Sequence, residues 1–222
     1  TGAVLTLMSI GTMLIWSATR PRMIVLGLDP NSYLKKQIIT VAVALVLGLA
    51  VVQMKYLMLR ALAPFIYGFG LLGLIAVLIP HVGTEVNGIQ AWIPLPGGFT
   101  LQPSEFVKLA VVLTLSMVLS ETVQRYAVPG LRDFIMSLAL VAVPAGLIML
   151  QPDFGTTLVI GVVMLGLFSA SGVPIKYLSA LAVTGVGVLV LAWTNPRILH
   201  EYQKDRLTVF IDPAADAQGA GY

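Results

Sequence analysis

The chain has 222 residues, of which 58% are hydrophobic and 10% are charged, and its mean hydropathy is +0.94. Soluble domains carry about 25% charged residues, so this composition excludes a water-soluble globular domain and indicates an integral membrane protein. The net charge of +3 is small and scattered, which argues against a nucleic-acid partner. The lack of cysteine excludes a disulfide framework, a thiolate nucleophile and a thiolate metal site in this chain.

Seven apolar runs are candidates for membrane-spanning helices, which need about 20 mostly apolar residues. They show no polar alternation, so helices are favoured over barrel strands. The runs are Thr1–Ser17, Gln37–Gln53, Ala61–Pro80, Glu105–Leu119, Phe134–Leu150, Thr156–Ser171 and Tyr177–Thr194. We therefore predict an all-α polytopic membrane protein with about seven transmembrane helices, in a single transmembrane domain over residues 1–222.

Seven spans would place the connecting loops alternately on two faces of the membrane. Face A carries residues 17–36, 81–104, 151–155 and 195–222, and face B carries residues 54–60, 120–133 and 172–176. Eight of the ten acidic residues lie on or next to face A, and only Glu121 and Asp133 lie on face B. The Lys and Arg count mildly favours face A as cytoplasmic. By themselves, the residues leave the orientation open.

The motif Gln102-Pro103-Ser104-Glu105, followed by Lys108, opens the fourth predicted helix. Proline suits the first turn of a helix, and an acid there meets the positive end of the helix dipole. Glu105 and Lys108 are three residues apart, so they are predicted to share a helix face and to pair. Two interpretations stay open for this motif: a capped helix start with a structural ion pair, or part of a substrate cavity.

The run from Gln151 to Thr157 repeats the Gln-Pro-acid pattern at another helix start on face A. Two such starts could direct amide groups at one anionic ligand. Acids in those first turns disfavour direct phosphate contact unless a metal ion or a basic side chain intervenes. For Asp153, the residues slightly favour a capping role.

The loop over residues 81–104 contains the turn signals Asn87-Gly88 and Pro94–Gly98. Trp92 lies between them and is typical of the aromatic belt at a membrane interface. His81 and His200 are isolated and show no metal-ligand spacing, so we interpret them as surface residues.

The stretch Asn195–Tyr222 is the one long polar run of the sequence. Residues 199–211 have the periodicity of an amphipathic surface helix. Asp216 follows in a segment rich in Ala and Gly, where a solvated acid is the plain interpretation and a catalytic acid the alternative.

Together, these motifs resemble those of the SEDS family of shape, elongation, division and sporulation proteins, which includes RodA and FtsW. The resemblance covers essentially the whole chain. It rests on Asn87-Gly88 with Trp92, Gln102–Lys108, Gln151–Thr156, Glu201-Tyr202-Gln203 with Arg206, and Asp212–Asp216 with Gly219–Tyr222. Two of these motifs look more similar to RodA than to FtsW, namely Gln151–Thr156 and Asp212–Tyr222. The segment Leu95–Gly98 resembles actinobacterial members.

The resemblance implies a fold of about ten helices, of which this chain would hold the first seven, with residues 195–222 as the start of a large extracytoplasmic loop. It implies a location in the bacterial plasma membrane with face A outside. It also implies an inverting glycosyltransferase that polymerises lipid II into peptidoglycan during cell elongation and shape maintenance. The implied partners are a class B penicillin-binding protein and the elongation or division machinery. We expect the isolated fragment to be inactive.

The resemblance also assigns roles to residues. Asp216 corresponds to the key loop acid of the family and is predicted to be the general base. Gln102, Glu105 and Lys108 correspond to a motif near the central cavity, and Arg206 corresponds to a loop Arg. Trp92 and Asp153 complete the predicted substrate residues. The family often has Arg just before the Trp, but Ala91 stands here, so no role of that Arg carries over.

Family and chemistry lead us to expect a divalent cation, Mg²⁺ or Mn²⁺, although the sequence shows no metal-binding motif and leaves its ligands unknown. Two other functions fit polar groups around a membrane cavity: a flippase or transporter of lipid-linked precursors, and a noncatalytic scaffold for cell-wall enzymes.

Overall fold

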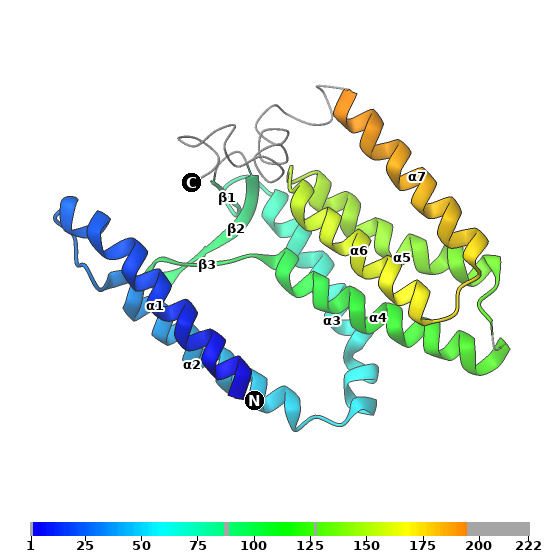
Figure 1. The fold of residues 1–222 in the computed structure, drawn as a ribbon, viewed down its shortest axis with the longest axis horizontal. Helices are drawn as coiled ribbons and strands as arrows, with labels where there is room; N and C mark the ends of the chain where they lie inside the picture. The colour runs from blue at the N-terminus through cyan, green and yellow to red at the C-terminus, as the bar shows by residue number, and fades with distance from the viewer. Residues whose placement is uncertain (1, 87–88, 127, 195–222) are drawn as a thin grey trace. The chain divides into compact units, whose positions relative to one another are not determined.

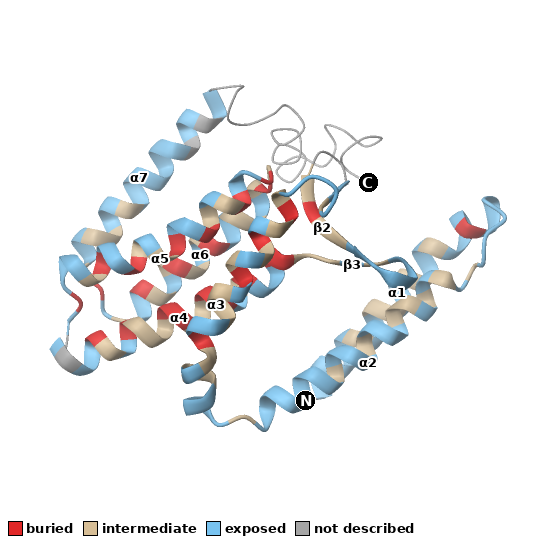
Figure 2. Ribbon diagram, turned by 180° about the vertical axis from the view of Figure 1, so that it is seen from behind, coloured by how far each residue is buried: buried red, intermediate tan, exposed pale blue. Residues whose placement is uncertain are grey.

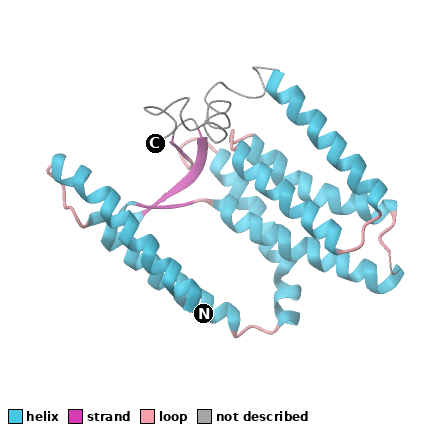
Figure 3. Ribbon diagram, in the orientation of Figure 1, coloured by secondary structure: helices cyan, strands magenta, loops and turns pink. Residues whose placement is uncertain are grey.

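The computed structural model describes residues 2–86, 89–126 and 128–194. Within these ranges the chain forms seven α-helices and one small three-stranded sheet (Figures 1 and 3). The helices are α1 (Gly2–Val25), α2 (Ser32–Val52), α3 (Tyr56–Leu78), α4 (Pro103–Tyr126), α5 (Leu131–Met149), α6 (Phe154–Ala170) and α7 (Ile175–Thr194). All seven predicted apolar runs are therefore confirmed as helices.

The sheet lies in the segment that we predicted to be a loop. It consists of β1 (Thr84–Val86), β2 (Ile89–Leu95) and β3 (Phe99–Leu101), in that order, with the 3₁₀ turn Pro96–Gly98 between β2 and β3. Strands β1 and β2 are antiparallel. The small sheet is an addition to the predicted helical fold, which is otherwise confirmed.

Five of the described helices, α1 to α5, have the length and apolar composition to cross a membrane, and α6 and α7 contribute shorter apolar helices. Large apolar side chains such as Leu7 (69% exposed) and Phe69 (80% exposed) lie on their outer surfaces. In lipid, this exposure is favourable, and a helix satisfies its own backbone hydrogen bonds. The chain is therefore a multi-pass membrane protein.

The described residues form two compact units. The first contains α1 and α2, which pack together, and residues Pro96–Phe99. Its contacts include a hydrogen bond from Lys36 Nζ to the carbonyl oxygen of Gly98 at 3.0 Å. Gly98 has φ +73°, a conformation that glycine adopts without steric cost. That the whole of residues 1–222 is one transmembrane domain stays a prediction.

The second unit contains α3 to α7 with β1, β2 and the end of β3. Helix α4 is its centre, packing against α5 and α6. Val107, Val111, Leu115 and Leu119 of α4 recur at four-residue steps and are at most 1% exposed. They therefore form one continuous buried face of the helix. Figure 2 shows the buried positions on the sides of α3 to α6 that face one another.

Hydrogen bonds to backbone carbonyls tie the helices of this unit together. The Tyr67 hydroxyl of α3 donates to the Leu140 carbonyl of α5 at 2.7 Å. Thr114 of α4 donates to the Ala63 carbonyl of α3 at 3.2 Å. Interhelical hydrogen bonds of this kind help helices associate where hydrophobic burial supplies little driving force.

Candidate functional site

The first predicted motif forms the start of α4 as expected. Pro103 is the first helical residue, and the carbonyl of Gln102 accepts the first hydrogen bond from the backbone N–H of Glu105 at 3.2 Å. Proline is well suited here because the first N–H groups of a helix have no partner within the helix. Ser104 is fully buried, so the motif enters the packed part of the unit directly.

Glu105 and Lys108 form the predicted ion pair, with Lys108 Nζ 2.7 Å from Glu105 Oε1. The Glu105 side chain is 55% exposed and the Lys108 side chain is 26% exposed. An exposed pair of this kind adds at most about 1 kcal/mol to stability. The pair therefore presents both charges at the surface of the unit, where they remain accessible to a ligand.

Asp153 has the predicted capping role at the second motif. Its Oδ1 accepts a hydrogen bond from the backbone N–H of Thr156 at 3.0 Å, and its Oδ2 accepts one from Thr156 Oγ1 at 2.7 Å. The carboxylate is thus the N-cap of α6 and lies at the positive end of the helix dipole. The residue is only 8% exposed.

The two Gln-Pro-acid motifs meet in the second unit. Gln102 Nε2 donates to Asp153 Oδ2 at 3.4 Å, which joins the start of α4 to the start of α6. Gln151 is 1% exposed, and its Nε2 donates to the carbonyl of Leu74 in α3 at 3.2 Å. The structure therefore brings Gln102, Glu105, Lys108 and Asp153 to one end of the same helix bundle.

Trp92 lies on β2 rather than in a loop, opposite Thr84 of β1, and is half-buried. Its neighbour Ala91 is fully buried, and Gln90 Nε2 donates to the Val77 carbonyl at 3.0 Å, which ties the strand to the end of α3. Ala91 therefore packs inside the unit.

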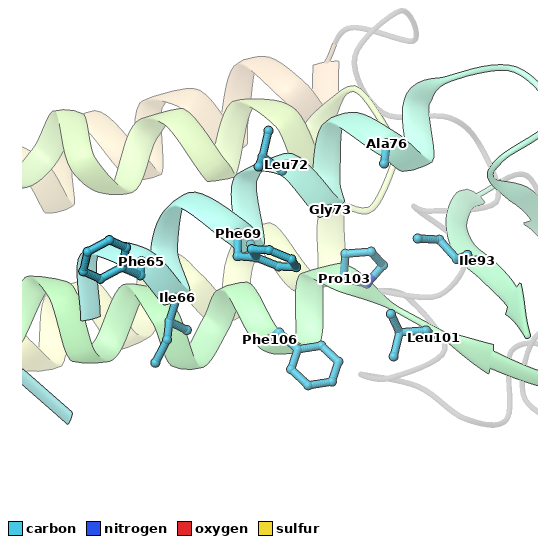
Figure 4. A pocket seen from close by; sticks show the side chains of 11 residues that line it. Phe65, Ile66, Phe69, Leu72, Gly73, Ala76, Ile93, Leu101, Pro103 and Phe106 are labelled. Carbon is cyan, nitrogen blue, oxygen red and sulfur yellow. The ribbon is translucent and has the colours of Figure 1, made fainter. Parts of the chain in front are cut away.

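An apolar groove of about 710 Å³ adjoins the start of α4 (Figure 4). Its walls come from α3, from the first turn of α4, and from Ile93 of β2 and Leu101 of β3. Pro103 and Phe106 line it. Each directly follows a polar residue of the first motif, Pro103 after Gln102 and Phe106 after Glu105. The predicted site residues did not include this groove, because its lining is ordinary apolar sequence drawn from four elements.

Asp216 and Arg206, and the predicted amphipathic helix 199–211, lie outside the described residues. In the described ranges, no group of three or more His, Cys, Asp or Glu side chains is arranged to hold a metal ion. Both oxygens of Asp153 are hydrogen-bonded, and Glu105 is paired with Lys108. The two predicted site acids in these ranges, Asp153 and Glu105, are therefore both engaged by neighbouring protein groups.

Fold and site together define a helical polytopic membrane protein with polar helix starts gathered at one end. The chain belongs to the FtsW, RodA and SpoVE family of cell cycle proteins, whose profile matches residues 1–222.

Curated relatives cover nearly the whole chain. A probable peptidoglycan glycosyltransferase FtsW of Aromatoleum aromaticum is 34% identical over 97% of this chain and 52% of its own length. The protein of the same name from Nitrosococcus halophilus is 34% identical over 100% of this chain and 55% of its own length. The chain thus spans about half the length of these relatives.

Solved structures show the same fold. A structure of a peptidoglycan synthase complex that coordinates polymerization and crosslinking has a TM-score of 0.65 and 31% identity, covering 94% of this chain and 60% of that one. The rod shape determining protein RodA of Thermus thermophilus has a TM-score of 0.55 and 29% identity, covering 80% and 58%. Similarity therefore extends to proteins named FtsW and RodA, and the closer likeness to RodA stays a prediction.

Proposed function

We propose that the whole protein is a peptidoglycan glycosyltransferase that polymerises lipid II into glycan strands. The observation that carries the proposal is the apolar groove beside the joined Gln102–Asp153 helix starts and the Glu105–Lys108 pair. This arrangement suits a substrate with a long apolar tail and an anionic head group. The names of the FtsW relatives and of the synthase complex support the same activity.

Glycosyl transfer from a lipid diphosphate makes three chemical demands. The attacking hydroxyl must lose a proton, the leaving diphosphate must be compensated, and water must be excluded. We assign Asp216 as the general base that takes the proton from the acceptor hydroxyl. The acceptor oxygen attacks the anomeric carbon on the face opposite the diphosphate, so the bond from this carbon to the diphosphate oxygen breaks and the configuration inverts. Two basic side chains are assigned to the diphosphate: Lys108, which lies in the described part of the chain, and Arg206, which lies in the tail.

A divalent cation, Mg²⁺ or Mn²⁺, stays within the proposal, where it would be held by one or two carboxylates together with the phosphates of the substrate. No step here depends on it. A cation of this kind would supply charge compensation for the diphosphate.

We further propose that face A is extracytoplasmic in a bacterial plasma membrane. A class B penicillin-binding protein would supply crosslinking within the elongation or division machinery. The synthase complex, which coordinates polymerization with crosslinking, supports a partner of this class.

The test uses the full-length protein in detergent with purified lipid II. Asp216→Asn should reduce glycan formation by about 10²–10⁴-fold, the usual contribution of a general base. Asp205→Asn is the matched control, since it removes another tail acid to which no role is assigned, and it should keep the wild-type rate. Near-normal polymerisation by Asp216→Asn would refute the assignment. Failure of the wild-type protein to form glycan without a sealed bilayer would favour a flippase.

A further inference from the structure

The Asp153 carboxylate is engaged by three donors from its own protein. Thr156 supplies its backbone N–H to Oδ1 at 3.0 Å and its hydroxyl to Oδ2 at 2.7 Å, and Gln102 Nε2 donates to Oδ2 at 3.4 Å. With 8% of the residue exposed, the carboxylate points into the packed helix starts rather than outward. A carboxylate arranged in this way organises other groups instead of binding a substrate.

Gln102 is held at two points as a result. Its side chain bonds to the cap of α6, while its backbone carbonyl accepts the 3.2 Å hydrogen bond from the N–H of Glu105. One residue thus connects the N-cap of α6 to the first turn of α4. Glu105 and Lys108 project from the first two turns of α4, so their positions depend on this connection.

We propose that Asp153 is a positioning residue that, through Gln102, fixes the first turn of α4 and with it the Glu105–Lys108 pair. The inference rests on the proposed function, because turnover reports how well that pair is placed. Displacement of reacting groups by about 1 Å can cost about 10²-fold in rate. Asp153 therefore contributes to turnover without touching the substrate.

Asp133 provides a matched control in the same unit. It lies in the first turn of α5, where its Oδ2 accepts a hydrogen bond from the backbone N–H of Gly130 at 3.1 Å. This hydrogen bond stays within the start of α5 and reaches no other helix. Replacing Asp133 removes a local hydrogen bond at a helix start without removing a bond to the start of α4.

The first experiment compares Asp153→Ala with Asp133→Ala in the full-length protein. Asp153→Ala should lower kcat for lipid II polymerisation by about 10- to 100-fold, as expected when reacting groups are displaced by up to about 1 Å, with little change in KM. Asp133→Ala should leave kcat unchanged. Equal losses in both variants, or an unchanged kcat in Asp153→Ala, would overturn the proposal.

A swap of the two bonding groups keeps the test decisive if Asp153→Ala folds poorly. Gln102→Glu places two carboxylates against each other and should lower kcat. Adding Asp153→Asn restores an amide–carboxylate pair with the roles reversed, and Asn caps a helix about as well as Asp. The double variant should therefore recover most of the lost kcat. No recovery would mean that the bond between these two side chains does not set kcat, which contradicts the proposal.

Hydrogen exchange supplies a readout that does not depend on catalysis. Amide exchange over residues 102–108 should rise in Asp153→Ala and stay at the wild-type level in Asp133→Ala. If the wild-type protein makes no glycan, the proposed function fails while exchange still decides whether Asp153 holds α4. Unchanged exchange over residues 102–108 would overturn the positioning role even in an active polymerase.

Discussion

Asp29, in the connection between α1 and α2, accepts a 2.7 Å hydrogen bond from Lys35 Nζ. This bond, with a further one from the backbone N–H of Asn31, lowers the pKa of Asp29 below its ordinary value. The folded pKa is therefore the lower one. The stabilising contribution of the pair is present above the unfolded pKa of about 3.9 and is lost as pH falls through the folded pKa.

Lys35→Met should raise the pKa of Asp29 toward that ordinary value, as measured by carbon-13 NMR titration of the carboxyl group. Lys36→Met is the neighbouring control, because Lys36 bonds to the Gly98 carbonyl instead. It should leave the Asp29 titration unchanged. An Asp29 pKa that does not respond to Lys35→Met would contradict the attribution.

At this scale, the predictable contacts were the local ones. The Glu105–Lys108 pair follows from a spacing of three residues on one helix, and the Asp153 cap follows from the backbone of the next turn. The bond between Gln102 and Asp153 spans 51 positions and depends on how α4 and α6 pack. The sequence predicted both motifs on face A, but it contained no signal that Gln102 of the first motif would bond to Asp153 of the second.

Helix α3 packs closely against α4 at a glycine. A Cβ at Gly70 would lie 2.8 Å from Cγ2 of Val107, which is 1% exposed and has a stiff, branched side chain. Gly70→Ala should therefore destabilise the protein by about 1–3 kcal/mol, the usual cost of overpacking. The measurement is the thermal unfolding midpoint in detergent.

Gly68, two residues earlier on α3, is the matched control. A Cβ there would have no atom within 4 Å, and alanine is a better helix former than glycine. Gly68→Ala should leave the midpoint unchanged or raise it slightly. Similar losses at both glycines would mean that close packing at Gly70 is not the cause.

At the scale of elements, helices were easier to predict than their ends or the sheet. An apolar run marks the part of a helix within lipid, but backbone hydrogen bonding continues beyond it. Helix α1 therefore extends to Val25 and α4 to Tyr126, past the predicted ends at Ser17 and Leu119. The dipeptide Asn87-Gly88 between apolar residues is a strong hairpin signal that could have predicted the pairing of β1 with β2.

We predict that the described helices cross the membrane in alternating directions, and this threading can be tested because the chain has no cysteine. Leu28→Cys and Thr84→Cys place single cysteines in connections that we predict to lie on face A. Lys55→Cys, Val128→Cys and Ile175→Cys place them at connections that we predict to lie on face B. An impermeant maleimide should label the first group in intact cells and the second only after permeabilisation. The reverse pattern would make face A cytoplasmic, as the Lys and Arg count alone favours.

Sequence by itself determined that this is a polytopic helical membrane protein of a recognisable family, because apolar composition, helix-start motifs and their order are properties of the chain read locally. Tertiary structure alone decided which polar groups meet. It joined Gln102 to Asp153, anchored Gln151 on α3, and formed the apolar groove from α3, α4, β2 and β3. Such contacts depend on helix packing across dozens of residues, and no local pattern encodes which side chains will face one another.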